Sequence, residues 1–231
     1  STCVVTGTSG AGKSSLVTLY AHAAGTKGIR STFFCFDERL QTLLRRADGL
    51  GMPLEPLVES GMIQFHQINV GSISPGELAA KVRYAVEKEK VGIVVLDSLS
   101  GYLQSMPGER ELITQLHELL GYLSGAGVLC LMVIATHGLF GTVESPVDVS
   151  YIADAVILLR HFEARGVVRR CLAVLKKRYG HHEKTIRELQ LSGEGVTVGE
   201  PLTAFSGLLT GLPRYEGEPS SLIDHQPGHS G

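Results

Sequence analysis

Over the first 136 residues, short apolar runs rich in β-branched residues alternate with longer segments in which apolar residues recur every three or four positions. The short runs predict buried strands, and the longer period predicts amphipathic helices. The expected strands are 2–6, 31–36, 63–69, 92–97 and 128–136. Strands that alternate with helices are typical of βαβ units, so this part of the chain predicts an α/β fold with a parallel sheet.

Two helices between these strands carry recognisable end signals. Residues 74–77 read Ser-Pro-Gly-Glu, which places a serine at an N-cap, a proline at the first helical position and a glutamate three residues after the cap. We therefore predict a helix from Pro75 to about Lys90. A second helix is expected from Glu109 to Ser124, because its leucines fall on one side and glycines follow its end.

After residue 154 the pattern changes to consecutive strands joined by short turns. Residues 155–159, 167–175 and 186–191 read as strands, with glycine-containing turns at 164–166 and 193–195. This succession predicts an antiparallel C-terminal extension of the sheet. From residue 216 to 231 the apolar periodicity is lost, so a disordered tail is expected to follow a domain of residues 1–215.

Composition limits the classes of protein to consider. The 231 residues are 43% hydrophobic and 19% charged, as in a globular domain that buries a large core without disulfides or metals. Apolar runs are too short to cross a bilayer, and no basic segment followed by an apolar one opens the chain, so we expect a cytoplasmic protein without a membrane partner. The four cysteines lie in apolar runs without C-x-x-C spacing, which predicts buried reduced thiols.

One glycine-rich segment carries a phosphate-binding motif. Residues 7–14 read Gly-Thr-Ser-Gly-Ala-Gly-Lys-Ser and fit the pattern G-x-x-x-x-G-K-[ST] at every fixed position. A strand is expected before the motif and a helix at 15–21 after it, which is the context the motif requires; the alternative is a plain glycine-rich turn. Backbone N–H groups and the helix N-terminus would hold the phosphates of ATP. The expected nucleotide-binding residues are Thr8, Ser9, Gly10, Ala11, Gly12, Lys13, Ser14 and Ser15.

Carboxylates end two of the expected strands. Lys13 would reach the β- and γ-phosphates, while the Ser14 hydroxyl and Asp97, at the end of an apolar strand, would complete a Mg²⁺ site. Asp37 and Glu38 end another strand and would face the same crevice, because ligands of open α/β sheets bind beyond the carboxyl ends of the strands. A carboxylate there can activate water, or it can simply stabilise the N-terminus of the following helix.

Taken together, these motifs resemble the RecA-superfamily ATPases of the KaiC type, and the similarity runs from Thr2 to about Tyr215. In that family the second strand ends in a glutamate pair that acts as hydrolytic base, matching Asp37 and Glu38. The fourth strand ends in I-D-S-L, matching residues 96–99, and the closing segment 209–215 is similar as well. The resemblance implies a RecA-like P-loop NTPase fold and suggests the C-terminal domain of a KaiC-like protein.

A second matching segment implies a ring. The family pattern K-x-R-G-x-x-H matches residues 176–182 with the glycine displaced by one position. By this resemblance Lys176 and Arg178 would reach the γ-phosphate of a neighbouring subunit in a homo-oligomeric, hexameric ring; a basic run alone would more often be a solvated face. The superfamily also carries polar groups that sense the γ-phosphate after the fifth strand, where His137 stands here.

The chain departs from the family pattern at three places. Asp37 is one methylene shorter than glutamate, so Glu38 is expected to carry more of the base role. The Ser-Thr pair that is autophosphorylated in the clock protein corresponds to Ser150-Tyr151, which leaves Ser150 as the one similar phosphoacceptor and puts clock-type phosphorylation cycling in doubt. Serine autokinase activity stays open, and the alternative role of Ser150 is a turn hydroxyl. The chain also begins at its first strand, without the lead-in segment of family members.

Two other functions stay open from the sequence. A DNA-stimulated recombinase or helicase would need basic loops, yet residues 138–150 contain no Lys or Arg and two acids, and the formal net charge is −2, so nucleic acid is not the expected partner. A signalling scaffold could bind ATP or ADP to hold a ring together with little turnover, and protein partners would then read its state.

Overall fold

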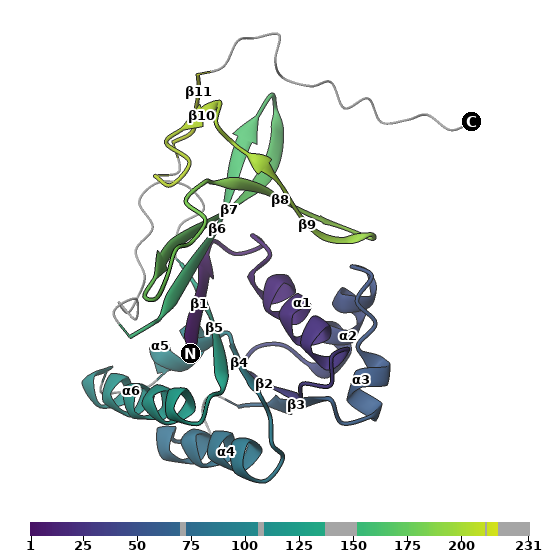
Figure 1. The fold of residues 1–231 in the computed structure, drawn as a ribbon, viewed down its shortest axis with the longest axis vertical. Coiled ribbons are helices and arrows are strands. Elements are labelled where there is room, and N and C mark those ends of the chain that lie inside the picture. The colour runs from purple at the N-terminus through teal and green to yellow at the C-terminus, as the bar shows by residue number, and fades with distance from the viewer. Residues whose placement is uncertain (70–72, 106–108, 137–151, 211, 217–231) are drawn as a thin grey trace.

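The computed structural model describes residues 1–69, 73–105, 109–136, 152–210 and 212–216, which form a nine-stranded sheet with helices on both faces (Figure 1). The strand order is β3-β2-β4-β5-β1-β6-β7-β8-β9. Six of these strands run parallel: β1 (Thr2–Gly7), β2 (Ser31–Cys35), β3 (Ile63–Gln67), β4 (Ile93–Asp97), β5 (Leu129–Ala135) and β6 (Ala155–Ala164).

The remaining three strands of this sheet are antiparallel. They are β7 (Val167–Lys177), β8 (Arg187–Ser192) and β9 (Gly195–Pro201). Arg165 and Gly166 both have positive φ at the β6–β7 turn, the backbone that a tight hairpin requires. A separate two-stranded sheet joins β10 (Phe205–Ser206) to β11 (Arg214–Tyr215).

Alternate residues of the central strands face two different helical layers. Val5, Val95 and Leu131 pack with α1 (Lys13–Gly25) and α2 (Leu40–Asp48), whereas their neighbours Val4, Val94 and Met132 pack with the opposite layer. That layer contains α4 (Pro75–Glu87), α5 (Leu99–Ser105) and α6 (Glu109–Gly125), and α3 (Glu55–Glu59) lies on the side of α1 (Figure 1). A sheet buried on both faces explains why its strands read as continuous apolar runs.

The α/β, RecA-like fold expected from the sequence is confirmed. The five strands of the first half lie where they are predicted, with ends that differ by at most two residues. The capping box at Ser74 is present: its hydroxyl accepts a hydrogen bond from Glu77 N at 3.3 Å, and Glu77 Oε2 accepts one from Ser74 N at 2.8 Å. The helix ends at Glu87, three residues before Lys90.

The structure differs from the prediction in the direction of one C-terminal strand and in the number of elements. The strand expected at 155–159 extends to Ala164 and pairs parallel with β1, so the antiparallel extension begins one strand later, at β7. Apolar alternation does not reveal strand direction, which depends on the connection between strands. The helix expected after Glu38, for which no bounds were predicted, is α2. The helices α3 and α5 and the strands β9, β10 and β11 are additional elements that the sequence reading did not identify.

Two other expectations concern exposure. Cys35, Cys130 and Cys171 are buried and Cys3 is partly exposed, all with free thiols. Within the described ranges, every helix falls short of the length or apolarity that a membrane crossing requires. Residues 217–231 lie outside the described part of the chain, so the boundary after residue 215 and the disordered tail stay predictions.

Candidate functional site

The phosphate-binding motif lies between β1 and α1, where the sequence predicts it. Gly7, Gly10 and Gly12 have φ values of 145°, 75° and 102°, a region that L side chains rarely adopt. A β-carbon on Gly7 would come 1.9 Å from the carbonyl oxygen of Leu159 on β6, so only glycine lets the two strands approach here. The motif therefore depends on close packing as well as on phosphate geometry.

Lys13 is the first residue of α1 and points back onto the loop. Its side chain is buried, and Nζ donates a hydrogen bond to the carbonyl oxygen of Thr8 at 2.7 Å. Burial lowers the pKa of Lys13, and the nearby Asp97 opposes that shift. The ammonium group is thus held within the loop that the motif assigns to the phosphates.

A cavity of about 460 Å³ opens beside this loop at the carboxyl ends of β2 and β4. All eight of its lining residues are polar or charged, and the loop, the strand ends and α2 contribute them together. The lining residues are Ser14, Asp37, Glu38, Arg39, Thr42, Arg46, Asp97 and Ser98. The cavity brings together both sequence-predicted Mg²⁺ residues and both predicted acids.

Asp97 and Ser14 form a pair in this cavity. Asp97 is the last residue of β4 and is only 6% exposed, and its side chain accepts a hydrogen bond from Ser14. Burial raises the pKa of Asp97, while Ser14, Arg46 and Lys13 oppose the shift. A buried carboxylate next to a hydroxyl offers the hard oxygen ligands that Mg²⁺ prefers, so these residues fit that ion.

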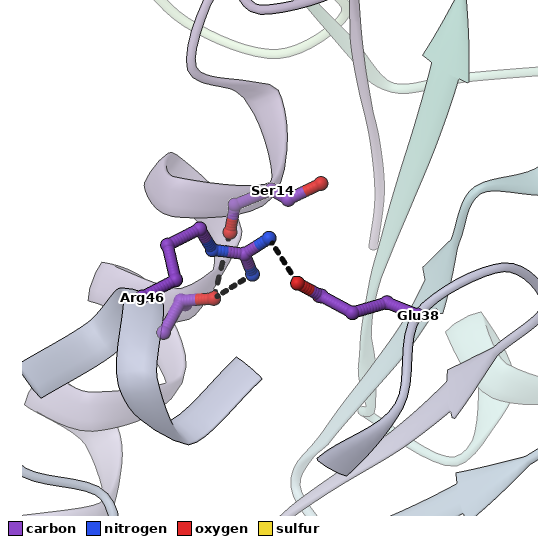
Figure 2. A network of polar contacts seen from close by, with 4 residues as sticks. Ser14, Glu38 and Arg46 are labelled. Atoms are coloured by element: carbon purple, nitrogen blue, oxygen red, sulfur yellow. Dashed lines mark hydrogen bonds and ion pairs between the residues drawn. The ribbon is translucent and has the colours of Figure 1, made fainter. Parts of the chain in front are cut away.

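The side chains of the adjacent acids Asp37 and Glu38 point to different neighbours. Glu38 Oε1 pairs with Arg46 Nη1 at 2.7 Å, and the side chain is 17% exposed (Figure 2). Asp37 is exposed and lies against α5, since a β-carbon on Gly101 would come 3.4 Å from Asp37 Oδ1. Burial raises the pKa of Glu38, whereas Arg46 lowers it and Asp97 raises it further.

Arg46 was not identified from the sequence. It lies on α2, and Nη2 donates to Thr18 Oγ1 at 3.4 Å, while the Thr18 hydroxyl donates to the carbonyl oxygen of Ser14 at 2.7 Å. Arg39, Thr42 and Arg46 recur every three to four residues directly after the acids, and that helical spacing of polar residues is the signal that points to the cavity.

The C-terminal strands β6, β7 and β8 also contact the phosphate loop, which the sequence reading missed. His161 on β6 lies with Nδ1 3.2 Å from Thr8 Oγ1, and Arg170 on β7 donates from Nε to the carbonyl oxygen of Gly10 at 3.2 Å. Leu191 on β8 lies so near that a β-carbon on Gly12 would come 2.9 Å from its Cδ1. Three strands thus support the loop from one side.

Lys176 and Arg178 lie away from this chain's own loop. Lys176 pairs with Val156 near the start of β6, and Arg178 binds Asp154 through its backbone N–H at 2.6 Å and through Nη1 at 3.1 Å. Asp154 Oδ2 accepts a hydrogen bond from Thr2 N at 2.9 Å, so Arg178 stands at the beginning of β1. The loop follows the other end of that six-residue strand, about 20 Å away.

The predicted γ-phosphate sensor and phosphoacceptor, His137 and Ser150, lie outside the described residues. The preceding residue, Thr136, is described: it is buried at the end of β5, and its N–H donates to the carbonyl oxygen of Gly7 at 3.1 Å. Its hydroxyl has no hydrogen-bond partner among the described residues. The fifth strand therefore ends directly beside the loop.

Residues 1–203 match the ATPase family KaiC. The chain belongs to this family. Similar proteins include the circadian clock protein KaiC3 of Synechocystis sp., which is 28% identical over 92% of this chain and 42% of its own length. KaiC2 of the same organism is 27% identical over 93% of this chain and 38% of its own length. The circadian clock oscillator protein KaiC of Synechococcus elongatus is 25% identical over 91% of this chain and 40% of its own length.

The chain spans about two fifths of the length of these curated KaiC relatives. Over that span the KaiC match covers the phosphate loop, the ends of β2 and β4 and all of β6 to β9. Family membership makes the chain a P-loop protein of the ATP-binding KaiC ATPase class.

Proposed function

We propose that this KaiC-family domain hydrolyses ATP with Mg²⁺ in a site that a neighbouring copy of the chain completes. The observation that carries the proposal is the cavity at the phosphate loop, where the Ser14–Asp97 pair and the two acids Asp37 and Glu38 converge. Lys13 and the loop backbone bind the triphosphate, and Glu38 accepts a proton from the attacking water.

Ser14 and Asp97 hold Mg²⁺, directly or through its water shell. When bound, the ion neutralises negative charge on the phosphate oxygens. The hydrogen bond between the two side chains supports this assignment, because it places a hydroxyl and a buried carboxylate side by side before any ion arrives. Asp37 lines the same cavity and contributes to its polarity.

Lys176 and Arg178 act on the neighbour's nucleotide in a ring of copies, for which six is the expected number. Their position near the start of β1 supports action in trans, because they lie about one strand length from the loop of their own chain. An arginine supplied across a subunit boundary can raise the rate by about 10³–10⁵. We place this assembly in the cytoplasm.

A complementation experiment tests the shared site. Lys13→Ala should abolish tight ATP binding, whereas Arg178→Ala should leave binding to a single subunit intact and slow turnover. When the two impaired variants are mixed and reassembled, turnover should exceed that of either variant alone, because an intact loop can then meet an intact Arg178. Lys177→Ala is the matched control, since Lys177 is exposed in the same segment, where its Nζ donates a hydrogen bond to the carbonyl oxygen of His181 at 3.1 Å.

Two outcomes would contradict the proposal. Equal loss of single-subunit ATP binding in Lys13→Ala and Arg178→Ala would refute the assignment of Arg178 to a neighbouring site. Full turnover by monomers, established by mass measurement under assay conditions, would show that no neighbour is needed. Adding single-stranded DNA to the assay tests the recombinase alternative, which requires strong, salt-sensitive stimulation.

A further inference from the structure

We propose that Arg46 is the residue that positions Glu38 for hydrolysis. The inference rests on the proposed function and adds a residue to it. A line of polar contacts runs from the Ser14 carbonyl oxygen through the Thr18 hydroxyl to the Arg46 guanidinium and ends on Glu38 (Figure 2). Arg46 therefore connects the first turn of α1, which follows the phosphate loop, to the acid at the end of β2.

The two oxygens of Glu38 have different surroundings. Oε1 receives the Arg46 ion pair at 2.7 Å, while Oε2 is buried and has no hydrogen-bond partner among the described residues. A buried carboxylate oxygen without a donor is unfavourable, so this atom is available to accept a hydrogen bond from a water molecule in the cavity. Arg46 holds one oxygen and thereby orients the other.

The geometry of the guanidinium suits this role. Its Nη1 donates a hydrogen bond to Glu38 and its Nη2 donates one to Thr18. Because the guanidinium is rigid and planar, these two bonds together fix its orientation. The helix α2 begins two positions after Glu38, and Arg46 is its seventh residue, so the helix places Arg46 at the cavity that Glu38 also lines. Both side chains are largely shielded, with exposures of 27% for Arg46 and 17% for Glu38, which limits the freedom of the pair.

Substitution of Arg46 tests the inference in the assembled wild-type background. Arg46→Ala should lower kcat for ATP by about 10²-fold, the effect of a misplaced catalytic group, and leave KM within about threefold. Arg46→Lys should restore part of kcat, because an ammonium can still contact Oε1 but cannot hold two partners in one plane. Arg45→Ala removes the same charge from the neighbouring exposed position and should leave kcat unchanged.

A double-mutant cycle separates positioning from other roles. In a Glu38→Gln background, Arg46→Ala should cause less than about a twofold further loss of kcat, because the residue acts through Glu38. If Arg46→Ala slows the Glu38→Gln enzyme as strongly as the wild type, Arg46 acts elsewhere and the inference is overturned. A higher kcat in Arg46→Ala would also overturn it, because the ion pair would then restrain Glu38 rather than position it.

Separate control measurements are needed for loss of the fold and for failure of the proposed function. Circular dichroism and urea unfolding of Arg46→Ala and Arg46→Gln show whether a lost activity reflects a lost fold, and Arg46→Gln keeps most of the side-chain volume. A wild-type domain that does not hydrolyse ATP would overturn the proposed function and this inference together. Wild-type hydrolysis that survives Arg46→Ala at full rate would overturn only this inference.

Discussion

The Nδ1 atom of His161 lies 3.2 Å from the hydroxyl oxygen of Thr8, although the two residues are 153 positions apart. The contact joins β6 to the phosphate loop, and the Arg170 hydrogen bond to Gly10 lies beside it. The loop is therefore held by side chains of the C-terminal strands as well as by its own glycines. The state of His161 should influence the stability of the loop.

Stability should fall when His161 is protonated. Burial, together with Arg170 and Lys13, lowers the pKa of His161 below its ordinary value of 6.5. The unfolded chain then binds a proton more readily than the folded chain, so the free energy of unfolding decreases as pH falls through about 6.5 and levels off below the lower folded pKa. Urea unfolding of wild type and His161→Gln between about pH 7.5 and 5.5 measures this effect.

Comparing wild type with His161→Gln isolates the contribution of His161 to the pH dependence of unfolding. Other groups with shifted pKa values, including His66 and Glu38, titrate equally in both chains, so the difference between the two curves belongs to His161. His117→Gln, at an exposed position of α6, is the control for removing a histidine from the opposite helical layer. If the His161→Gln curve runs parallel to wild type, the contact with Thr8 carries no pH dependence.

Gly7→Ala should disrupt the junction between β1 and β6. The new β-carbon would lie 1.9 Å from the carbonyl oxygen of Leu159, and the backbone φ of 145° is unfavourable for alanine. Because both strands are central and buried, we expect the free energy of unfolding to fall by about 4 kcal/mol or more. Chemical denaturation of the nucleotide-free chain measures the loss.

Gly121→Ala is the matched control for that substitution. Gly121 lies within α6, and a β-carbon there would meet nothing within 4 Å. Its replacement should raise the free energy of unfolding by about 0.5–1 kcal/mol through the helix propensity of alanine. Similar effects from both substitutions would show that the Leu159 carbonyl can move aside.

Ser74→Ala should destabilise the start of α4. Ser74 and Glu77 exchange hydrogen bonds as a capping box, and these bonds lower the pKa of Glu77. Loss of an N-cap serine costs about 1 kcal/mol, measured as a lower urea midpoint with an unchanged slope. Ser124→Ala, at an exposed position near the end of α6, should not lower the midpoint; an equal fall in both variants would refute the capping role.

Such local features could be predicted from the sequence because all their partners lie within a few residues. The capping box at Ser74 spans four positions, and the phosphate loop spans eight, so residue type and spacing define both. The strand ends at Asp97 and Glu38 could be placed in one crevice because parallel strands end at the same edge of a sheet.

The supports of the site could not be predicted in that way. His161 contacts Thr8, and Arg46 contacts Glu38 and Thr18, only after tertiary packing brings separate elements together. Nothing in the residues near His161 distinguishes it from a surface histidine, because its partner Thr8 is 153 positions away in the sequence. The direction of β6 escaped prediction for the same reason, since its pairing with β1 depends on a distant strand.

Glu38→Gln should impair hydrolysis far more than Asp37→Asn. Glu38 is anchored by Arg46 and keeps one buried oxygen without a partner, whereas Asp37 is exposed and turned toward α5. Loss of a general base lowers kcat by about 10²–10⁴-fold, so Glu38→Gln should lose kcat by a factor in that range. Asp37→Asn should lose much less. Both replacements are nearly isosteric, and equilibrium binding of a non-hydrolysable ATP analogue should be retained in each. An equal or greater loss of kcat in Asp37→Asn would transfer the base role to Asp37 and show that exposure in the nucleotide-free chain does not decide which acid activates the water.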